Sequence, residues 1–238
     1  MKKAVLSLSG GMDSTALLVA FLAEGYEVSA LSFDYGQKHK LELERLAQNI
    51  TYLSEKGYEI EHTVLDVSQI GNIYESALTN EAISVPEGHY EEDNMKATVV
   101  PNRNMIFFSM IAGYALSIAT KNNCEFYVEA MNAFNAGNWD SKLVKLKLPY
   151  IDGDKFTILQ DSAYNCEKLD LDFDIIFANT NTSYAPDEKG RANGKTGSDV
   201  ERILAFHKLG RRDPIEYVGG WDYALENALT LEAEFESK

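Results

Sequence analysis

The chain begins with a short apolar segment that runs directly into a glycine-containing turn and then into a helix. Residues 3–8 (KAVLSL) are predicted to form a strand, and Ser9-Gly10-Gly11-Met12-Asp13-Ser14 follows at once. Apolar residues from 16 to 22 predict the helix, which Gly25 ends as a C-cap residue. Glycines let the backbone turn tightly and approach a ligand closely. Because successive N–H groups and the positive end of a helix dipole favour negative charge, this loop predicts an anion site.

An alternation of strands and helices continues beyond this loop. Residues 27–33 and 59–65 are predicted to be the second and third strands, and residues 38–53 have the apolar spacing of an amphipathic helix. Residues 125–131 (EFYVEAM) predict a fourth strand. This order is typical of an α/β fold with a parallel sheet and helices on both of its faces.

One long segment interrupts the alternation. Residues 72–98 are polar and acidic without a sustained period, which is typical of a surface excursion or a mobile loop. A helix is predicted from Asn102 onward, where two adjacent rows of apolar residues predict a buried face: Ile106, Met110, Tyr114 and Ile118, spaced by four, with Phe107, Ile111 and Ala115 alongside.

The last third of the chain has a weaker pattern. Residues 146–151 and 172–178 are interpreted as strand-like, and residues 199–209 and 222–234 as terminal helices. We therefore expect one domain over residues 1–238 with a helical part over about 199–238.

Composition excludes several classes of protein. The 238 residues include 22 Lys and Arg against 37 Asp and Glu, a net charge of −15, so a basic surface for nucleic acid is not expected. No apolar run is long enough to span a bilayer, and the first residues do not resemble a signal peptide, so a cytoplasmic location is expected. Cys124 and Cys166 provide neither a disulfide framework nor a metal cluster.

The glycine loop differs from the common phosphate-binding motifs. No Lys follows the glycines as in a Walker A loop, and Gly-x-Gly-x-x-Gly is absent. Asp13 is unusual beside a phosphate unless a cation bridges the two, so the loop predicts Mg²⁺. The alternative interpretation is a glycine-rich turn that only connects the strand to the helix.

Taken together, these segments resemble a known family. Ser9–Ser14 is similar to the PP-loop of the N-type ATP pyrophosphatases, and within them the chain resembles the 7-cyano-7-deazaguanine synthases. The resemblance is carried by Phe33–His39 (FDYGQKH), by Val100–Asn104 (VPNRN) with the following Phe-Phe-Ser, and by the tail Gly197–Pro214. It covers most of the chain, and it implies a doubly wound, Rossmann-like α/β fold and a homodimer.

The resemblance also implies which residues carry the chemistry. ATP would be bound by the loop, the segment after the second strand and the arginine of the third motif, namely Ser9, Gly10, Gly11, Asp13, Ser14, Phe33, Tyr35, Gln37 and Arg103. Asp13, Arg103 and Lys38 would be catalytic, with Asp13 holding Mg²⁺. Substrate would contact His39, Asn104, Asn132, Trp139 and Asp140. Lys38 and His39 are equally interpreted as plain polar residues at a helix start, and Trp139 as ordinary core packing.

Two departures from the family pattern are visible. In the resembled family a zinc site is formed by four cysteines, and here these positions are Ser183, Asn193, Thr196 and Asp199, which cannot form a thiolate site. We therefore expect no structural zinc and a hydrogen-bonded loop in its place. The substrate segment reads NAFNAGNWDS over residues 132–141 and lacks the family's Cys-Arg pair, so the acyl acceptor and the product are open.

Several functions remain in competition. The leading expectation is ATP-dependent adenylation of 7-carboxy-7-deazaguanine followed by transfer to ammonia. A second keeps the activation and joins the deazaguanine to an amine on a partner protein, as the family's divergent members in antiphage operons and phages suggest. A tRNA-modifying enzyme is disfavoured by the charge of −15. A non-catalytic module that binds ATP or AMP is disfavoured because Asp13 and Arg103 are both retained.

Overall fold

A computed structural model describes residues 2–38, 41–89, 91–122, 126–127, 144–145, 147–150 and 152–237. Within these ranges the strands form one parallel sheet in the order β3-β2-β1-β4-β5. They are β1 (Lys2–Ser7), β2 (Tyr26–Asp34), β3 (Glu61–Asp66), β4 (Phe126–Tyr127) and β5 (Val144–Lys145). The chain order reverses between β1 and β4, and ligands of open α/β sheets bind at such a point. The predicted α/β class with a doubly wound parallel sheet is confirmed.

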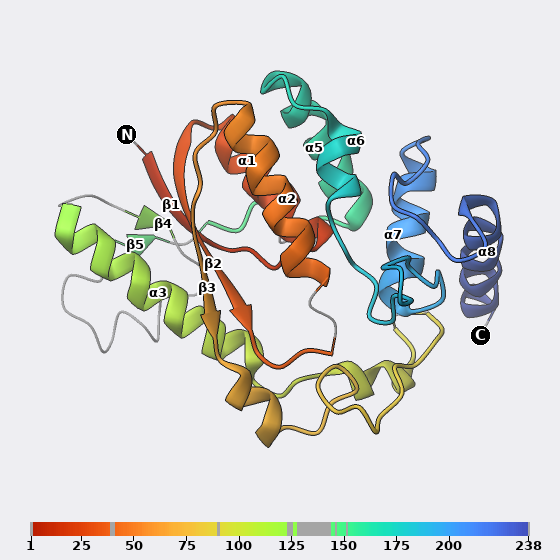
Figure 1. The fold of residues 1–238 in the computed structure, drawn as a ribbon. Coiled ribbons are helices and arrows are strands. Elements are labelled where there is room, and N and C mark those ends of the chain that lie inside the picture. The colour runs from red at the N-terminus through yellow and green to blue at the C-terminus, as the bar shows by residue number, and fades with distance from the viewer. Residues whose placement is uncertain are drawn as a thin grey trace.

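Helices connect and cover these strands (Figure 1). They are α1 (Met12–Ala23), α2 (Leu41–Glu55), α3 (Arg103–Asn122), α5 (Lys155–Lys168), α6 (Phe173–Ala178), α7 (Gly197–Lys208) and α8 (Trp221–Glu236), with the 3-10 turns η1 (Ser68–Ile73) and η2 (Asp93–Thr98). As predicted, Gly25 follows the end of α1 with a φ of +77°, a conformation that glycine adopts without strain.

Alternate residues of the central strands pack on opposite faces of the sheet. Ala4 and Leu6 of β1 join a core with α1, α2 and the C-terminal helices, whereas Val5 joins Leu31 and Phe33 of β2 in a core beneath α3. This alternation follows from the period of two residues in a strand. Figure 1 shows α1 and α2 on one side of the sheet and α3 on the other.

The C-terminal helices extend this core away from the sheet. Phe206 of α7 lies edge-on to Phe173 and Phe177 of α6, at ring-centroid distances of 6.1 and 6.2 Å. A separate cluster joins α7 to α8 through Ile203, Ala228 and their neighbours. Both terminal helices were predicted close to their observed bounds.

The interpretation of residues 172–178 as strand-like is wrong. These residues form α6, and the Asp172 side chain caps it by accepting hydrogen bonds from the N–H groups of Asp174 and Ile175. Residues 147–150, the described part of the other strand-like segment, contain no strand, and the adjacent strand is β5 instead. Helix α5 was not predicted.

The 72–98 segment crosses the molecule as a surface excursion. In Figure 1 it runs, in yellow, from the end of β3 towards α7 and α8 and returns to α3. Ala77, Leu78 and Met95 are buried along it, and η2 ends it. The burial of these apolar residues therefore attaches the segment to the rest of the molecule at several points.

Candidate active site

A cavity of about 390 Å³ opens where β1 and β2 end and α1 and α3 begin. It is lined by ten of the predicted site residues: Ser9, Gly11, Asp13, Ser14, Phe33, Tyr35, Gln37, Lys38, Arg103 and Asn104. Gly10 lies in the same loop, while His39, Asn132, Trp139 and Asp140 are outside the described residues. A volume in this range suits a small-molecule ligand.

The glycine loop is held in shape by packing and by its own hydroxyl groups. A Cβ built on Gly10, whose φ is +89°, would lie 2.1 Å from the carbonyl oxygen of Glu42, so only glycine fits against α2. Ser9 Oγ accepts a hydrogen bond from the Gly11 N–H at 3.2 Å, and Ser14 Oγ accepts one from the Ser9 N–H at 3.2 Å. The loop is therefore ordered around the first turn of α1, where the helix dipole attracts anions.

Asp13 faces a cation that the sequence analysis did not identify. Lys155, at the first position of α5, donates a hydrogen bond to Asp13 at 2.8 Å and lies 3.7 Å from Glu201 of α7. Lys155 and Glu201 also line the cavity. Helices α1, α5 and α7 thus bring alternating charges to one wall of the site.

Arg103, which also lines the cavity, is held by Tyr35. Its Nη1 donates to the Tyr35 hydroxyl at 3.1 Å, and its guanidinium lies 5.3 Å from the Tyr35 ring centroid. Burial raises the pKa of Tyr35, although the Arg103 charge opposes this shift, so the hydroxyl stays protonated. Phe33 stacks on Phe107 of α3 at 4.1 Å and belongs to the core beneath that helix, so only part of its ring faces the cavity.

Gln37 and Lys38 bind neighbouring backbone rather than facing open space. Gln37 Oε1 accepts from the Tyr35 N–H at 2.9 Å, which shapes the turn after β2. Lys38 Nζ donates to the Ile83 carbonyl at 2.6 Å, and its backbone N–H donates to the carbonyl of Leu78 at 3.0 Å. Because Leu78 also lines the cavity, Lys38 ties the 72–98 segment to the edge of the site.

The far end of that segment is attached to the C-terminal helices. The Gly88 N–H donates to the Lys195 carbonyl at 2.9 Å. His89 Nε2 lies 3.0 Å from a Glu232 carboxylate oxygen, and its ring stacks on Phe235 at 4.0 Å. These contacts hold the segment between the cavity and α8.

Glu42 is the third carboxylate of the cavity, on the first turn of α2. Burial raises its pKa to about 7, with the positive charge of Arg103 opposing the shift. A carboxyl group with such a pKa changes its charge near neutral pH and can accept or donate a proton there.

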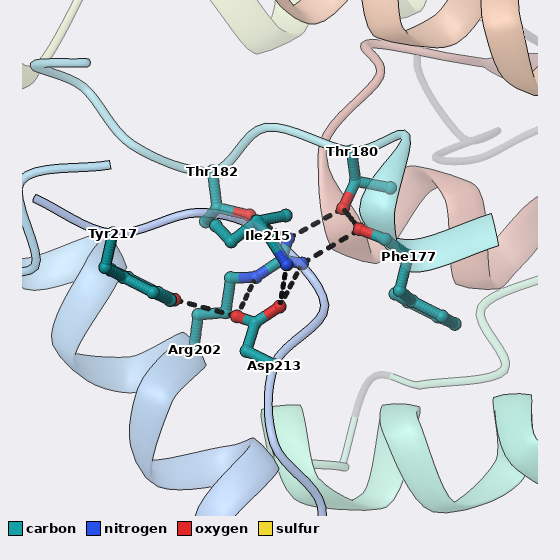
Figure 2. A network of polar contacts seen from close by, with 7 residues as sticks. All are labelled: Phe177, Thr180, Thr182, Arg202, Asp213, Ile215 and Tyr217. Atoms are coloured by element: carbon teal, nitrogen blue, oxygen red, sulfur yellow. Dashed lines mark hydrogen bonds and ion pairs between the residues drawn. The ribbon is translucent and has the colours of Figure 1, made fainter. Parts of the chain in front are cut away.

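Residues 181–184 form a further wall of the cavity, and a buried network holds them in place. The Asn181 N–H donates to the Gly10 carbonyl at 3.0 Å, which joins this wall to the glycine loop. Behind it, Arg202 Nη1 donates to the hydroxyls of Thr180 at 2.7 Å and Thr182 at 3.1 Å (Figure 2). Asp213 accepts from Arg202 Nε at 2.6 Å and from Nη2 at 2.9 Å, a bidentate pair that anchors the guanidinium.

The sequence of this chain is similar to those of known proteins. A family model described as "Queuosine biosynthesis protein QueC" matches residues 3–210. The chain belongs to this family. It is 39% identical over 231 residues to a 7-cyano-7-deazaguanine synthase of Methanoregula boonei, covering 90% of this chain and 99% of that one. A synthase of the same name from Marinomonas sp. is 41% identical over 233 residues, covering 91% and 98%.

A third relative, from Caldicellulosiruptor saccharolyticus, is also named 7-cyano-7-deazaguanine synthase and is 39% identical over 230 residues, covering 90% of this chain and 95% of that one. All three of these relatives are thus named as enzymes. A solved NMN synthetase from Francisella tularensis superposes with a TM-score of 0.40 at 13% identity, covering 98% of this chain and 84% of that one.

None of the helices in the described ranges is long and apolar enough to cross a membrane.

The four positions that replace the zinc cysteines lie in one hydrogen-bonded region of this QueC-family chain. Asp199 Oδ2 accepts from Thr196 Oγ1 at 2.8 Å and from Ser183 Oγ at 3.1 Å, and Thr196 and Asp199 form a capping box on α7. Asn193 Oδ1 accepts from the Lys195 N–H at 2.8 Å. Hydrogen bonds therefore join the segments that a metal would cross-link, while the expected lack of zinc stays a prediction.

Several cavity residues were not identified from the sequence. Most of them come from segments whose pattern was weak, whereas Glu42 and Phe107 lie on predicted helices without having been assigned to the site; together they are Glu42, Leu78, Phe107, Lys155, Asn181, Thr182, Tyr184, Ser198 and Glu201. For Lys155 a signal existed, because Asp154 precedes it as a helix N-cap and accepts a hydrogen bond from the Thr157 N–H.

Proposed function

We propose that this chain uses ATP to adenylate the carboxylate of 7-carboxy-7-deazaguanine and then transfers the acyl group to ammonia. One observation carries the proposal: the glycine loop, Arg103 and Lys155 converge on one cavity at the carboxyl edge of the sheet. Membership of a family whose relatives are named 7-cyano-7-deazaguanine synthase supports the choice of substrate.

The cavity has the charges that a triphosphate needs. The loop leads into the first turn of α1, where the helix dipole favours negative charge, and both Arg103 and Lys155 line the cavity. A guanidinium held by the Tyr35 hydroxyl is already oriented, so little entropy is lost when it binds phosphate oxygens. In the proposed complex, Lys38 keeps the 72–98 segment over the nucleotide through its bond to Ile83.

The residues present fit the magnesium ion that accompanies ATP. Mg²⁺ is usually held by one or two carboxylates together with substrate phosphates, and the Asp13 side chain, about half exposed at 54%, lies in the cavity beside the loop. Among the described residues no group of three His, Cys, Asp or Glu could hold a metal by itself, which suits an ion that arrives with phosphates. Bound there, Mg²⁺ would neutralise charge on the departing pyrophosphate.

The reaction then consists of two displacements. A carboxylate oxygen of the substrate attacks the α-phosphorus, and the bond to the β-phosphate breaks with release of pyrophosphate. Ammonia attacks the activated carbonyl carbon, and the bond to AMP breaks, which gives the amide. The nitrile in the relatives' name requires a second activation, in which the amide oxygen is adenylated and leaves with AMP. In both rounds the protein's task is positioning and charge neutralisation.

Mass spectrometry of an incubation with ATP, Mg²⁺ and 7-carboxy-7-deazaguanine, with and without ammonium, tests the proposal. We expect AMP, pyrophosphate and ammonium-dependent amide or nitrile. Arg103→Ala should lower pyrophosphate release by about 10²-fold or more, because a fixed charge-stabilising group is lost. Arg212→Ala is the matched control, since Arg212 is 66% exposed and lies outside the cavity.

Other outcomes would overturn parts of the proposal. Activation without an ammonium-dependent product, together with a protein adduct of the mass of the nucleobase, would replace ammonia by an amine on a partner protein. Absence of AMP and pyrophosphate with this substrate would refute the substrate assignment. Full activity of Arg103→Ala would refute the site.

A further inference from the structure

The three carboxylates of the cavity have different surroundings. Asp13 and Glu201 both lie within ion-pair distance of Lys155, at 2.8 and 3.7 Å. Glu42 interacts instead with Arg103 and Tyr35, and within the described part of the chain it forms no ion pair with a lysine. Glu42 is therefore the one of these three carboxylates whose negative charge is not stabilised by Lys155.

Glu42 is also directly beside the glycine loop. Its backbone carbonyl packs against Gly10, and its Oε1 lies 4.0 Å from the point where a Cβ on Gly11 would stand. Gly11 is the N-cap residue of α1. The carboxylate thus reaches the point at which the loop meets the helix, inside the cavity in which the proposed function places ATP and the substrate.

The carboxyl group of Glu42 changes its charge near neutral pH. Burial raises its pKa to about 7, against the opposing charge of Arg103 from α3. The other titratable or charged groups that line the cavity are Asp13 from α1, Tyr35 and Lys38 from the turn after β2, Lys155 from α5, Tyr184 from the segment after α6 and Glu201 from α7. A base with such a pKa is efficient at physiological pH, because it is largely ionised and still binds a proton well.

The second displacement of the proposed reaction needs such a base. At neutral pH the acyl acceptor is present almost entirely as ammonium, which has no lone pair with which to attack. We propose that Glu42 is the general base that takes a proton from the incoming ammonium ion beside the glycine loop. This inference rests on the proposed function.

The proton and electron balance is simple. One N–H bond of ammonium breaks and its proton goes to a Glu42 oxygen, leaving the electron pair on nitrogen. That pair forms the bond to the acyl carbon, and the bond from this carbon to the oxygen of AMP breaks. The second proton leaves the nitrogen for solvent as the amide forms.

A comparison of two nucleophiles tests this role. Glu42→Gln keeps the shape of the side chain but cannot accept the proton, so amide formation from ammonium should fall by about 10²-fold or more. Hydroxylamine is largely unprotonated at neutral pH and needs no base, so the ratio of hydroxamate to amide should rise by about 10²-fold or more in Glu42→Gln, whatever change the variant causes in the pyrophosphate-releasing step that precedes both products. Glu44→Gln, on the exposed side of the same helix turn, is the matched control and should leave all three rates unchanged.

Each contrary result overturns the inference. Ammonium-dependent rates within threefold of normal in Glu42→Gln would exclude a base, and an equal loss of amide and hydroxamate would assign Glu42 to positioning. Failure of pyrophosphate release in the unaltered protein would instead refute the proposed function, and the base with it.

The unaltered protein provides a test that does not depend on the folding of a variant. At fixed total ammonium, a site that simply admits free ammonia should gain about tenfold in rate per pH unit up to the pKa of ammonium. With Glu42 as the base, the rate should rise only until the carboxyl is ionised, near pH 7, and then level off. A continued rise above pH 8 would refute the role.

Discussion

The ion pair between Arg202 and Asp213 is the contact whose loss should cost this fold most. Both side chains are fully buried, with an Nε–Oδ2 distance of 2.6 Å. In Arg202→Met the Asp213 carboxylate loses both guanidinium donors and keeps only the Tyr217 hydroxyl and the Ile215 N–H (Figure 2). Each hydrogen bond to a charged group contributes roughly 1.5–3 kcal/mol, and breaking a buried ion pair costs about 3–5 kcal/mol, so we expect about 4 kcal/mol.

Urea unfolding followed by circular dichroism measures this loss directly. For a chain of this size 1 kcal/mol lowers Tm by about 2–4 °C, so Tm should fall by about 8–16 °C. Because the network also holds Thr180 and Thr182 behind the cavity wall, the folded variant should bind ATP more weakly at a temperature below its transition.

A double variant separates the pair from the packing. In Arg202→Met with Asp213→Leu the carboxylate of the pair is removed together with its partner, and the only other charge interaction that is lost is that of Arg202 with the hydrogen-bonded Asp199, so the double variant should recover at least half of the stability lost by Arg202→Met. A loss below about 1 kcal/mol in the single variant would refute the reasoning, as would a double variant whose loss equals the sum of the two single losses.

Three further predictions follow from single contacts. Gly10→Ala should lower the free energy of unfolding by several kcal/mol, because its Cβ would lie 2.1 Å from the Glu42 carbonyl oxygen. Gly25→Ala has no atom within 4 Å of its Cβ and should cost only about 1 kcal/mol of backbone strain, so equal losses of the two variants in urea titrations would contradict the prediction. The pKa of Glu42 is raised to about 7, so the folded state binds its proton more tightly than the unfolded state, and the free energy of unfolding should decline as pH rises from about 4.5 to about 7. Glu42→Gln should reduce the corresponding decline in Tm, and an unchanged slope of Tm against pH would contradict this prediction. Metal analysis should find far less than one zinc per chain, and a chelator should leave Tm unchanged because Asp199 accepts hydrogen bonds where a cysteine would bind metal; a stoichiometric zinc would show that the alignment of these positions is wrong.

The N-terminal half was predictable because its signals are local and mutually consistent. A short apolar strand, a glycine turn and an apolar helix follow each other over residues 3–22, and α3 was predicted from rows that repeat every four residues. Of these rows Ile111 and Ala115 are buried as predicted, whereas Met110 is exposed. These patterns fix both the elements and the sheet edge at which the loop and Arg103 meet. The predicted cavity residues between 9 and 38 came from the same short stretches.

The C-terminal third was harder to predict for physical reasons. In α5 the buried face includes Ser162 and Asn165 where apolar residues would be expected, so its helical period is masked. The six residues of α6 are too few to show a period, and their apolar run looks like a strand. Lys155 and Glu201 were therefore missed, because their place in the cavity depends on how these helices pack rather than on a local motif.

The attachment of the 72–98 segment has a consequence for how the protein is made. Its bonds to Lys195 and its contacts with Glu232 and Phe235 involve residues that leave the ribosome late, whereas the glycine loop and β1 to β3 are synthesised early. A nascent chain must therefore pass through a stage in which the loop is complete but the segment carrying Leu78 has no C-terminal anchor. Helix α8 is thus synthesised long after the glycine loop, yet it anchors the segment whose Leu78 lines the same cavity as that loop.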